Sequence, residues 1–175
     1  MLIRPARSED FAAIVAITNH YIATTAIHFA YEPLAEADIR AMWERYRDRH
    51  PWLVTEDAAS TGGAGRVVGY AKSGVWRDRA AYAWTAEVGL YIAPDARSKG
   101  IGTALYSALL AELVDRGFRS AVAGITLPNA ASIALHEKLG FEHVGTFADA
   151  GWKHGAWHAV DFWQKRFATD AAGPR

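Results

Sequence analysis

The chain has 175 residues, of which 51% are hydrophobic, and this length and composition suit one domain with a sizeable core. Its 19 basic and 19 acidic residues balance, so there is no electrostatic reason to expect nucleic acid or an anionic membrane as a partner. The absence of cysteine excludes disulfides, thiolate zinc sites and a cysteine nucleophile. The sequence has neither an apolar signal core at its start nor a run long enough to span a bilayer, and we expect a cytoplasmic protein.

The first half of the chain combines two helical patterns with four short strand patterns. Between the two helices, residues 23–33 break the helical spacing and are rich in threonine and aromatic side chains, so we expect a loop over a site. Residues 58–65 are small and glycine-rich, which predicts a turn between strands. The expected helices cover 11–22 and 35–49, and the expected strands cover 2–4, 52–55, 67–75 and 81–92.

The second half alternates helices and strands, and the order for the whole chain becomes β-α-α-β-β-β-α-β-α-β-β. Because hairpins and helical crossovers are mixed, this order predicts a mixed sheet of about seven strands in an α/β (α+β) fold. Residues 1–167 are expected to form a single domain, and 168–175 a disordered tail. The later helices are expected over 102–116 and 128–139, and the strands over 121–127, 142–148 and 157–167.

A glycine-rich turn, Arg97-Ser-Lys-Gly-Ile-Gly102, joins the strand that ends at Ile92 to the following helix. A helix start leaves N–H groups unpaired and carries partial positive charge, and glycines let the backbone approach a ligand closely. Arg97 and Lys99 add positive charge. The turn therefore predicts a cradle for a diphosphate.

Two familiar nucleotide-binding patterns do not fit this turn. A dinucleotide fingerprint would need a third glycine where Leu105 stands, and a P-loop would need Gly-Lys-Ser/Thr, whereas Lys99 precedes the glycine. The turn instead resembles the pyrophosphate loop of the GNAT superfamily of acyl-CoA N-acyltransferases, which is Arg-x-x-Gly-x-Gly at the start of a helix. A tight turn without a ligand is the alternative.

A second stretch, Asn129-Ala-Ala-Ser-Ile-Ala-Leu-His-Glu-Lys-Leu-Gly-Phe141, resembles the other CoA-side motif of this superfamily, with His136 where a tyrosine is usual. Further stretches, Trp84-Thr-Ala-Glu87 and Gly151-Trp-Lys-His-Gly-Ala-Trp-His158, resemble the branch of phosphinothricin and methionine sulfoximine N-acetyltransferases. The resemblance implies a GNAT fold whose two central strands splay apart around acetyl-CoA. It also implies acetyl transfer to the α-amine of a small amino acid analogue, and a homodimer.

The resemblance assigns the cofactor side of the site to the end of the central strand, the glycine turn and the helix that begins at Asn129. The residues expected to bind acetyl-CoA are Val88, Leu90, Tyr91, Ile92, Arg97, Ser98, Lys99, Gly100, Ile101, Gly102, Thr103, Asn129 and Ser132.

The reaction needs a base, because an amine reaches the site mostly protonated. Glu87, on the strand before the cradle, is the expected general base, and a paired structural charge is the alternative. His136 has a pKa near neutrality that suits a proton donor to the leaving thiolate; a packed histidine and a binding residue are the alternatives. With no cysteine available, acetyl transfer should be direct.

The substrate side is expected around the turn that precedes Glu87. Arg77 and Arg79 could pair with the substrate carboxylate or lie in a solvated turn. Four aromatic residues could wall the side-chain pocket or belong to the core: Phe29, Trp76, Tyr82 and Trp84. His154 and His158 have zinc-like spacing but no third ligand nearby, and we expect no metal.

Two other functions fit the same features. One is acetylation of a different amine, such as a protein N-terminus, a polyamine or an aminoglycoside. The other is a CoA-binding domain without catalysis, against which Glu87 and His136 argue.

Overall fold

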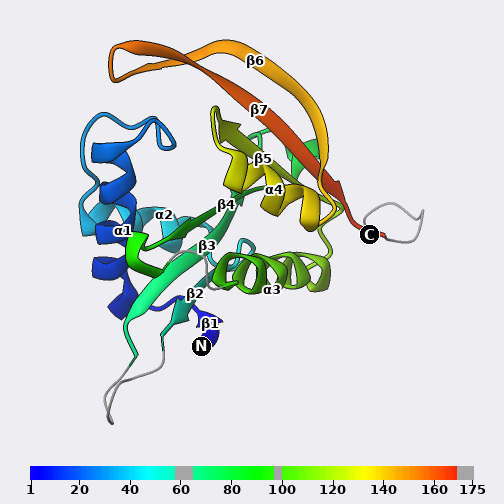
Figure 1. Ribbon diagram of the computed structural model, residues 1–175. Helices are drawn as coiled ribbons and strands as arrows, with labels where there is room; N and C mark the ends of the chain where they lie inside the picture. The colour runs from blue at the N-terminus through cyan, green and yellow to red at the C-terminus, as the bar shows by residue number, and fades with distance from the viewer. Residues whose placement is uncertain (58–64, 97–99, 169–175) are drawn as a thin grey trace.

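A computed structural model describes residues 1–57, 65–96 and 100–168 (Figure 1). The strands are β1 (Leu2–Pro5), β2 (Trp52–Glu56), β3 (Val67–Val75), β4 (Thr85–Ile92), β5 (Ser120–Thr126), β6 (Glu142–Lys153) and β7 (Ala156–Arg166). The helices are α1 (Phe11–Thr24), α2 (Glu36–Tyr46), α3 (Ile101–Asp115) and α4 (Ala130–Lys138). Short 3-10 turns cover Ser8–Asp10, Ala80–Tyr82 and Pro94–Ala96.

One seven-stranded sheet carries all of these strands in the order β1-β2-β3-β4-β5-β7-β6. Every neighbouring pair is antiparallel except β4 and β5, which run parallel. The parallel pair requires a crossover, and α3 supplies it on one face of the sheet. The predicted mixed α/β fold is confirmed.

Two hydrophobic clusters cover the two faces of the sheet. On one face Leu105, Leu109 and Leu113 of α3 pack on the buried side chains of Ala86 and Val88. This is the stripe that helical spacing predicts for a helix buried along one side. The other face is covered by α1 and α2 (Figure 1), and the residues of its cluster include Phe11, Ile14, Ile39, Val54 and Tyr70.

The two central strands separate soon after they begin. β4 pairs with β5 only from Thr85 to Glu87, opposite Ser120 to Val122. Beyond this point β4 continues to Ile92 beside β3, and β5 continues to Thr126 beside β7. The predicted splay is therefore present, and Glu87 is the last residue of β4 in the ladder between the two strands.

The last two strands form a long hairpin that arches toward the loop after α1 (Figure 1). β6 runs to Lys153, five residues beyond the predicted end at Ala148, because the hairpin turns only at His154 and Gly155, both with positive φ. β4 begins at Thr85 instead of Ala81, because 80–82 form a 3-10 turn. The expected turn at 58–64 and the tail at 169–175 lie outside the described residues. None of the described helices is long and apolar enough to cross a membrane.

Candidate active site

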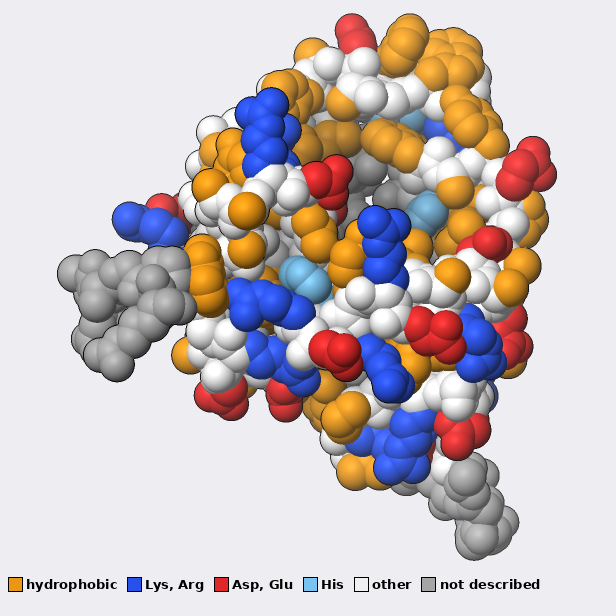
Figure 2. Space-filling view, turned by 180° about the vertical axis from the view of Figure 1, so that it is seen from behind, with side chains coloured by type: hydrophobic (Ala, Val, Ile, Leu, Met, Phe, Trp, Pro, Cys, Tyr) orange, Lys and Arg blue, Asp and Glu red, His pale blue; other side chains and the backbone are white. Residues whose placement is uncertain are grey.

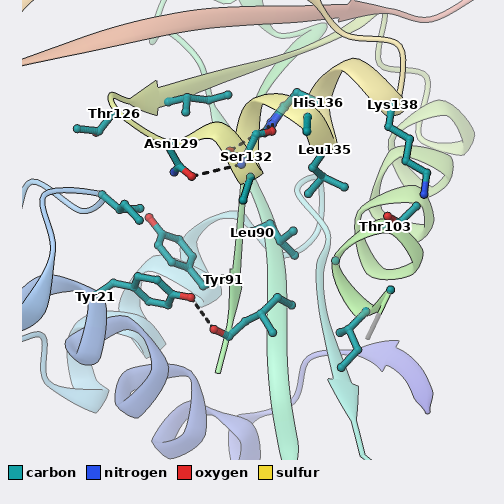
Figure 3. A pocket seen from close by; sticks show the side chains of 18 of the residues that line it. Tyr21, Leu90, Tyr91, Thr103, Thr126, Asn129, Ser132, Leu135, His136 and Lys138 are labelled. Carbon is teal, nitrogen blue, oxygen red and sulfur yellow. Dashed lines mark hydrogen bonds between the residues drawn. The ribbon is translucent and has the colours of Figure 1, made fainter. Parts of the chain in front are cut away.

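A cavity of about 560 Å³ opens where β4 and β5 separate (Figure 3). Its walls come from the end of β4, the start of α3, the end of β5 and one side of α4, with Tyr21 and Ile27 closing it on the side of α1. It contains His136 and most of the described residues predicted to bind acetyl-CoA: Leu90, Tyr91, Ile92, Gly100, Ile101, Gly102, Thr103, Asn129 and Ser132. Val88 does not line it, because its side chain is buried in the core below.

The start of α3 forms one rim of the cavity. Gly100 precedes the helix in a left-handed conformation, with φ of 72°. Gly102 lies so close to β4 that a β-carbon there would sit 3.4 Å from Leu90 Cδ2. The first N–H groups of a helix have no partner within it, and here the helix start lines the cavity. The predicted ligands Arg97, Ser98 and Lys99 lie outside the described residues.

The start of α4 forms the opposite rim. Asn129 caps the helix, because its side-chain oxygen accepts a hydrogen bond from the Ser132 N–H at 3.2 Å. Leu135 lies on the same side of the helix as Ser132 and borders the cavity (Figure 3). The cavity is thus enclosed by two helix starts on either side of the separated strands.

His136 is buried, and both of its ring nitrogens have partners. Nδ1 lies 2.7 Å from the Ser132 carbonyl oxygen, which can only accept, so Nδ1 carries the proton. In the neutral ring Nε2 is then an acceptor, and the hydroxyl of buried Tyr106 lies 3.1 Å away to donate. Burial lowers the pKa of His136 and favours this neutral form. The ring therefore has no free N–H to offer a leaving thiolate.

Glu87 stands at the point of separation on the face opposite α3. Its cross-strand partner is Gly74, and nothing described lies within 4 Å of a β-carbon built at that glycine. Gly89, two residues further along β4, is nearly as open. The Glu87 carboxylate therefore faces free space, and the molecule is hollowed beneath the hairpin (Figure 2). An acceptor molecule could enter on this side.

The environment of Glu87 suits a proton acceptor. Partial burial raises the pKa of its carboxyl above the ordinary value, and the positive charge of Lys72 opposes this rise. Lys72 lies diagonally across from Glu87 on β3, with its own pKa lowered by burial. Its ammonium lies 5.3 Å above the Trp52 ring. The raised pKa makes Glu87 a better proton acceptor than a carboxylate of ordinary pKa.

Two of the predicted substrate residues lie beside the hairpin. The Phe29 ring packs so closely on Gly151 that a β-carbon there would come within 2.5 Å of it. Trp76 packs edge-to-face on Phe162 of β7, with ring centroids 5.7 Å apart. Both side chains therefore pack against the hairpin, Phe29 on β6 and Trp76 on β7.

The other predicted substrate residues lie on another part of the surface. Arg77 and Arg79 line a separate cavity of about 320 Å³ beside the end of α2. Tyr82 is exposed, and Trp84 is covered by the guanidinium of Arg49 at 4.5 Å. The structure does not bring these four side chains into the cavity that contains His136.

Sequence reasoning missed several residues of the site. Tyr21 and Ile27 belong to segments assigned to core and loop, and Tyr106 sits on the buried side of α3 beside its leucines. A tyrosine among the buried leucines of a helix indicates that its hydroxyl has a buried hydrogen-bond partner. Here that partner is His136. His154 and His158 turn to the Thr25 and Lys153 carbonyls, and the described residues contain no group of three potential metal ligands.

Known proteins are similar to this chain in sequence and in fold. The model of the acetyltransferase (GNAT) family matches residues 14–141. A phosphinothricin N-acetyltransferase of Streptomyces viridochromogenes is 44% identical over 97% of this chain and 89% of its own length. An L-methionine sulfoximine/L-methionine sulfone acetyltransferase of Pseudomonas aeruginosa is 36% identical over 98% of each chain. A phosphinothricin acetyltransferase from Sinorhizobium meliloti, crystallised with AcCoA, superposes with a TM-score of 0.93 at 32% identity, covering 99% of this chain and 92% of its own.

Fold and cavity together define an acyl-CoA-dependent transferase. The chain belongs to the GNAT acetyltransferase family. The expected N-acetyltransferase class, with acetyl-CoA as co-substrate, is thereby confirmed.

We expect Gly100→Val to weaken acetyl-CoA binding, because a β-branched residue resists a φ of 72° and would distort the helix start at the cavity rim. Isothermal titration with acetyl-CoA measures the change. Gly117→Val is the matched control, since Gly117 has a φ of 77° and equally open surroundings at the other end of α3. Equal affinity in the two variants would contradict a cradle at Gly100.

Proposed function

We propose that this protein transfers the acetyl group of acetyl-CoA to the α-amine of a small amino acid or analogue of the methionine sulfoximine, methionine sulfone or phosphinothricin type. The relatives named for these substrates support the substrate class. The observation that carries the proposal is the position of Glu87, a carboxylate at the point where β4 leaves β5, between the cavity and the open face.

In the proposed reaction Glu87 removes a proton from the substrate ammonium, directly or through water. The amine nitrogen then forms a bond to the acetyl carbon, and the carbon–sulfur bond breaks with its electron pair going to the CoA sulfur. The second proton that the nitrogen loses passes to this thiolate, which gives the amide and free CoA thiol. We assign the binding of acetyl-CoA to the described cavity residues from Leu90 to Thr103 together with Asn129 and Ser132. The role of His136 in this proposal is to hold the first turn of α4 through its bond to Ser132.

The substrate class can be tested with a panel of amines and a measurement of free thiol released from acetyl-CoA. Methionine sulfoximine, methionine sulfone and phosphinothricin should release thiol much faster than ordinary amino acids or polyamines. Acetylation of polyamines, aminoglycosides or peptide N-termini in preference to all three would contradict the substrate class while leaving the enzyme class intact.

We expect Glu87→Gln to lower kcat/KM at neutral pH by about 10²–10⁴-fold, the usual contribution of a general base. The loss should shrink as pH rises, because more of the amine then arrives unprotonated. Acetyl-CoA affinity should stay unchanged, since Glu87 does not line the cavity. Glu142→Gln, on the exposed start of β6, is the control.

Lys72→Met gives an independent check on this assignment. Removing the cation raises the pKa of Glu87 further, so the acidic limb of the kcat/KM profile should move to higher pH. An unshifted limb, or an unchanged rate in Glu87→Gln, would remove Glu87 from the mechanism.

We further propose a homodimer formed through the hairpin. β6 is an edge strand that is exposed along nearly its whole length, a state that proteins commonly avoid by pairing or covering the edge. Four large hydrophobic side chains of the hairpin are exposed: Val144, Phe147, Trp152 and Trp157.

Analytical ultracentrifugation should show a dimer that Trp157→Glu converts to monomer, because a charge would be buried in the interface. Val114→Glu, at an exposed position on α3, should leave the dimer intact. A monomeric wild-type protein would refute this interface.

A further inference from the structure

Lys153, the last residue of β6, is a buried lysine at the tip of the hairpin. Only 3% of its surface is exposed. Its Nζ donates hydrogen bonds of 2.6 Å to the Ile22 carbonyl and of 2.6 Å to the His28 carbonyl. Within the described parts of the chain no carboxylate forms an ion pair with it. Burying an ammonium whose described partners are only backbone carbonyls costs desolvation free energy. This cost points to a structural role for the two hydrogen bonds, which hold the segments that carry these carbonyls.

The two carbonyls belong to α1 and to the loop that follows it. Ile22 lies in the last turn of α1, where carbonyls have no partner within the helix and carry partial negative charge. Lys153 therefore caps α1 from a distant strand. Through His28 the same nitrogen also holds the middle of the loop between α1 and α2.

Other contacts join the hairpin tip to this loop. The Tyr31 hydroxyl donates to the Trp152 carbonyl, and His154 Nε2 donates to the Thr25 carbonyl at 3.2 Å. The Phe29 ring packs on Gly151. Figure 1 shows the hairpin reaching across the molecule to the blue loop after α1. Of these contacts, the bonds from Lys153 are the most buried.

The loop borders the site. Ile27 lines the cavity, and the His28 ring lies 6.1 Å from the ring of Tyr91, another cavity residue. The end of the loop is fixed separately, since Asn19 exchanges two hydrogen bonds with the backbone of Leu34. The middle of the loop is held by its contacts with the hairpin tip.

We propose that Lys153 is a positioning residue for acceptor selection: by tying the loop around His28 to the hairpin, it sets the size of the amine that can reach Glu87. This inference rests on the proposed function. Lys153 itself does not touch the acceptor in this proposal. Its loss should loosen the loop around His28 and affect the amine more than acetyl-CoA, because only Ile27 of this loop borders the cavity assigned to acetyl-CoA.

The first test is Lys153→Met, which keeps the length of the side chain and removes the donor. We expect KM for the preferred amine to rise about 10-fold to 100-fold, the range expected when a positioning contact is lost. KM for acetyl-CoA should change much less than KM for the amine, since most of the cavity lining lies outside this loop. The ratio of kcat/KM for a larger amine to that for a smaller one should increase.

Lys165→Met is the matched control. Lys165 is also a hairpin lysine that donates to a backbone carbonyl at the end of a helix. Its Nζ lies 2.7 Å from the carbonyl oxygen of Leu139, the residue that follows α4. It lies at the end of β7 far from the hairpin turn. Both variants should lower the melting temperature. Only Lys153→Met should change the amine KM and the selectivity ratio.

Chemical rescue separates the ammonium from other effects of substitution. The chain contains no cysteine, so Lys153→Cys can be alkylated at that position alone with 2-bromoethylamine. Because the position is buried, the variant is alkylated while unfolded in denaturant and then refolded, which restores an ammonium on a side chain of lysine length. Alkylation should restore amine KM and selectivity. A lower melting temperature with unchanged amine KM and selectivity in Lys153→Met would overturn the proposal.

Hydrogen–deuterium exchange distinguishes failure of this inference from failure of the proposed function. If the wild-type protein acetylates no amine in the panel, the proposed function fails. Amide exchange in residues 25–34 still tests whether Lys153 holds the loop. Faster exchange there in Lys153→Met than in Lys165→Met supports it, and equal exchange in both overturns it.

Discussion

The separation of β4 from β5 is the constraint on which the rest of this structure depends. A strand in the middle of a sheet normally satisfies its backbone on both sides, and β4 loses one neighbour after Glu87. The fold meets this loss by placing two helix starts, at Gly100 and Asn129, around the gap. A bound molecule can then supply the missing partners, and the carboxylate at the point of separation stands beside it. In the proposed mechanism, binding of acetyl-CoA and proton removal both depend on this one break in the ladder.

Much of the fold and the acetyl-CoA side could be predicted from sequence, because these features are local. The strand before the glycine turn, the turn itself and the asparagine cap each lie within a short stretch. The predicted role of His136 as an acid illustrates the limit. Its position in the cavity followed from the motif, but the hydrogen bonds that fix its neutral form depend on Tyr106, which is 30 residues away. No local pattern reveals such a pairing.

The proposed acceptor side was harder to predict, because the segments assigned to it lie far apart in the chain. Arg77 and Arg79 were reasonable candidates by charge and proximity in sequence, yet they line a cavity beside α2. Phe29 stays a predicted substrate residue, and the partner on which it packs, Gly151, comes from the distant hairpin. Nothing in the sequence predicts that Lys153 is buried, since a lysine between two predicted strands is normally exposed to solvent. Only the register of the long hairpin brings it to α1 and buries it.

The bonds of Lys153 also set an order in which the parts of the enzyme can form. They connect residues separated by 131 and 125 positions in the chain. During synthesis the loop after α1 leaves the ribosome long before the hairpin that fixes it. Closing so long a loop costs entropy that only the completed contact repays. Lys153 can therefore hold the loop after α1 only once the hairpin has formed, so this contact is among the last long-range contacts to be made.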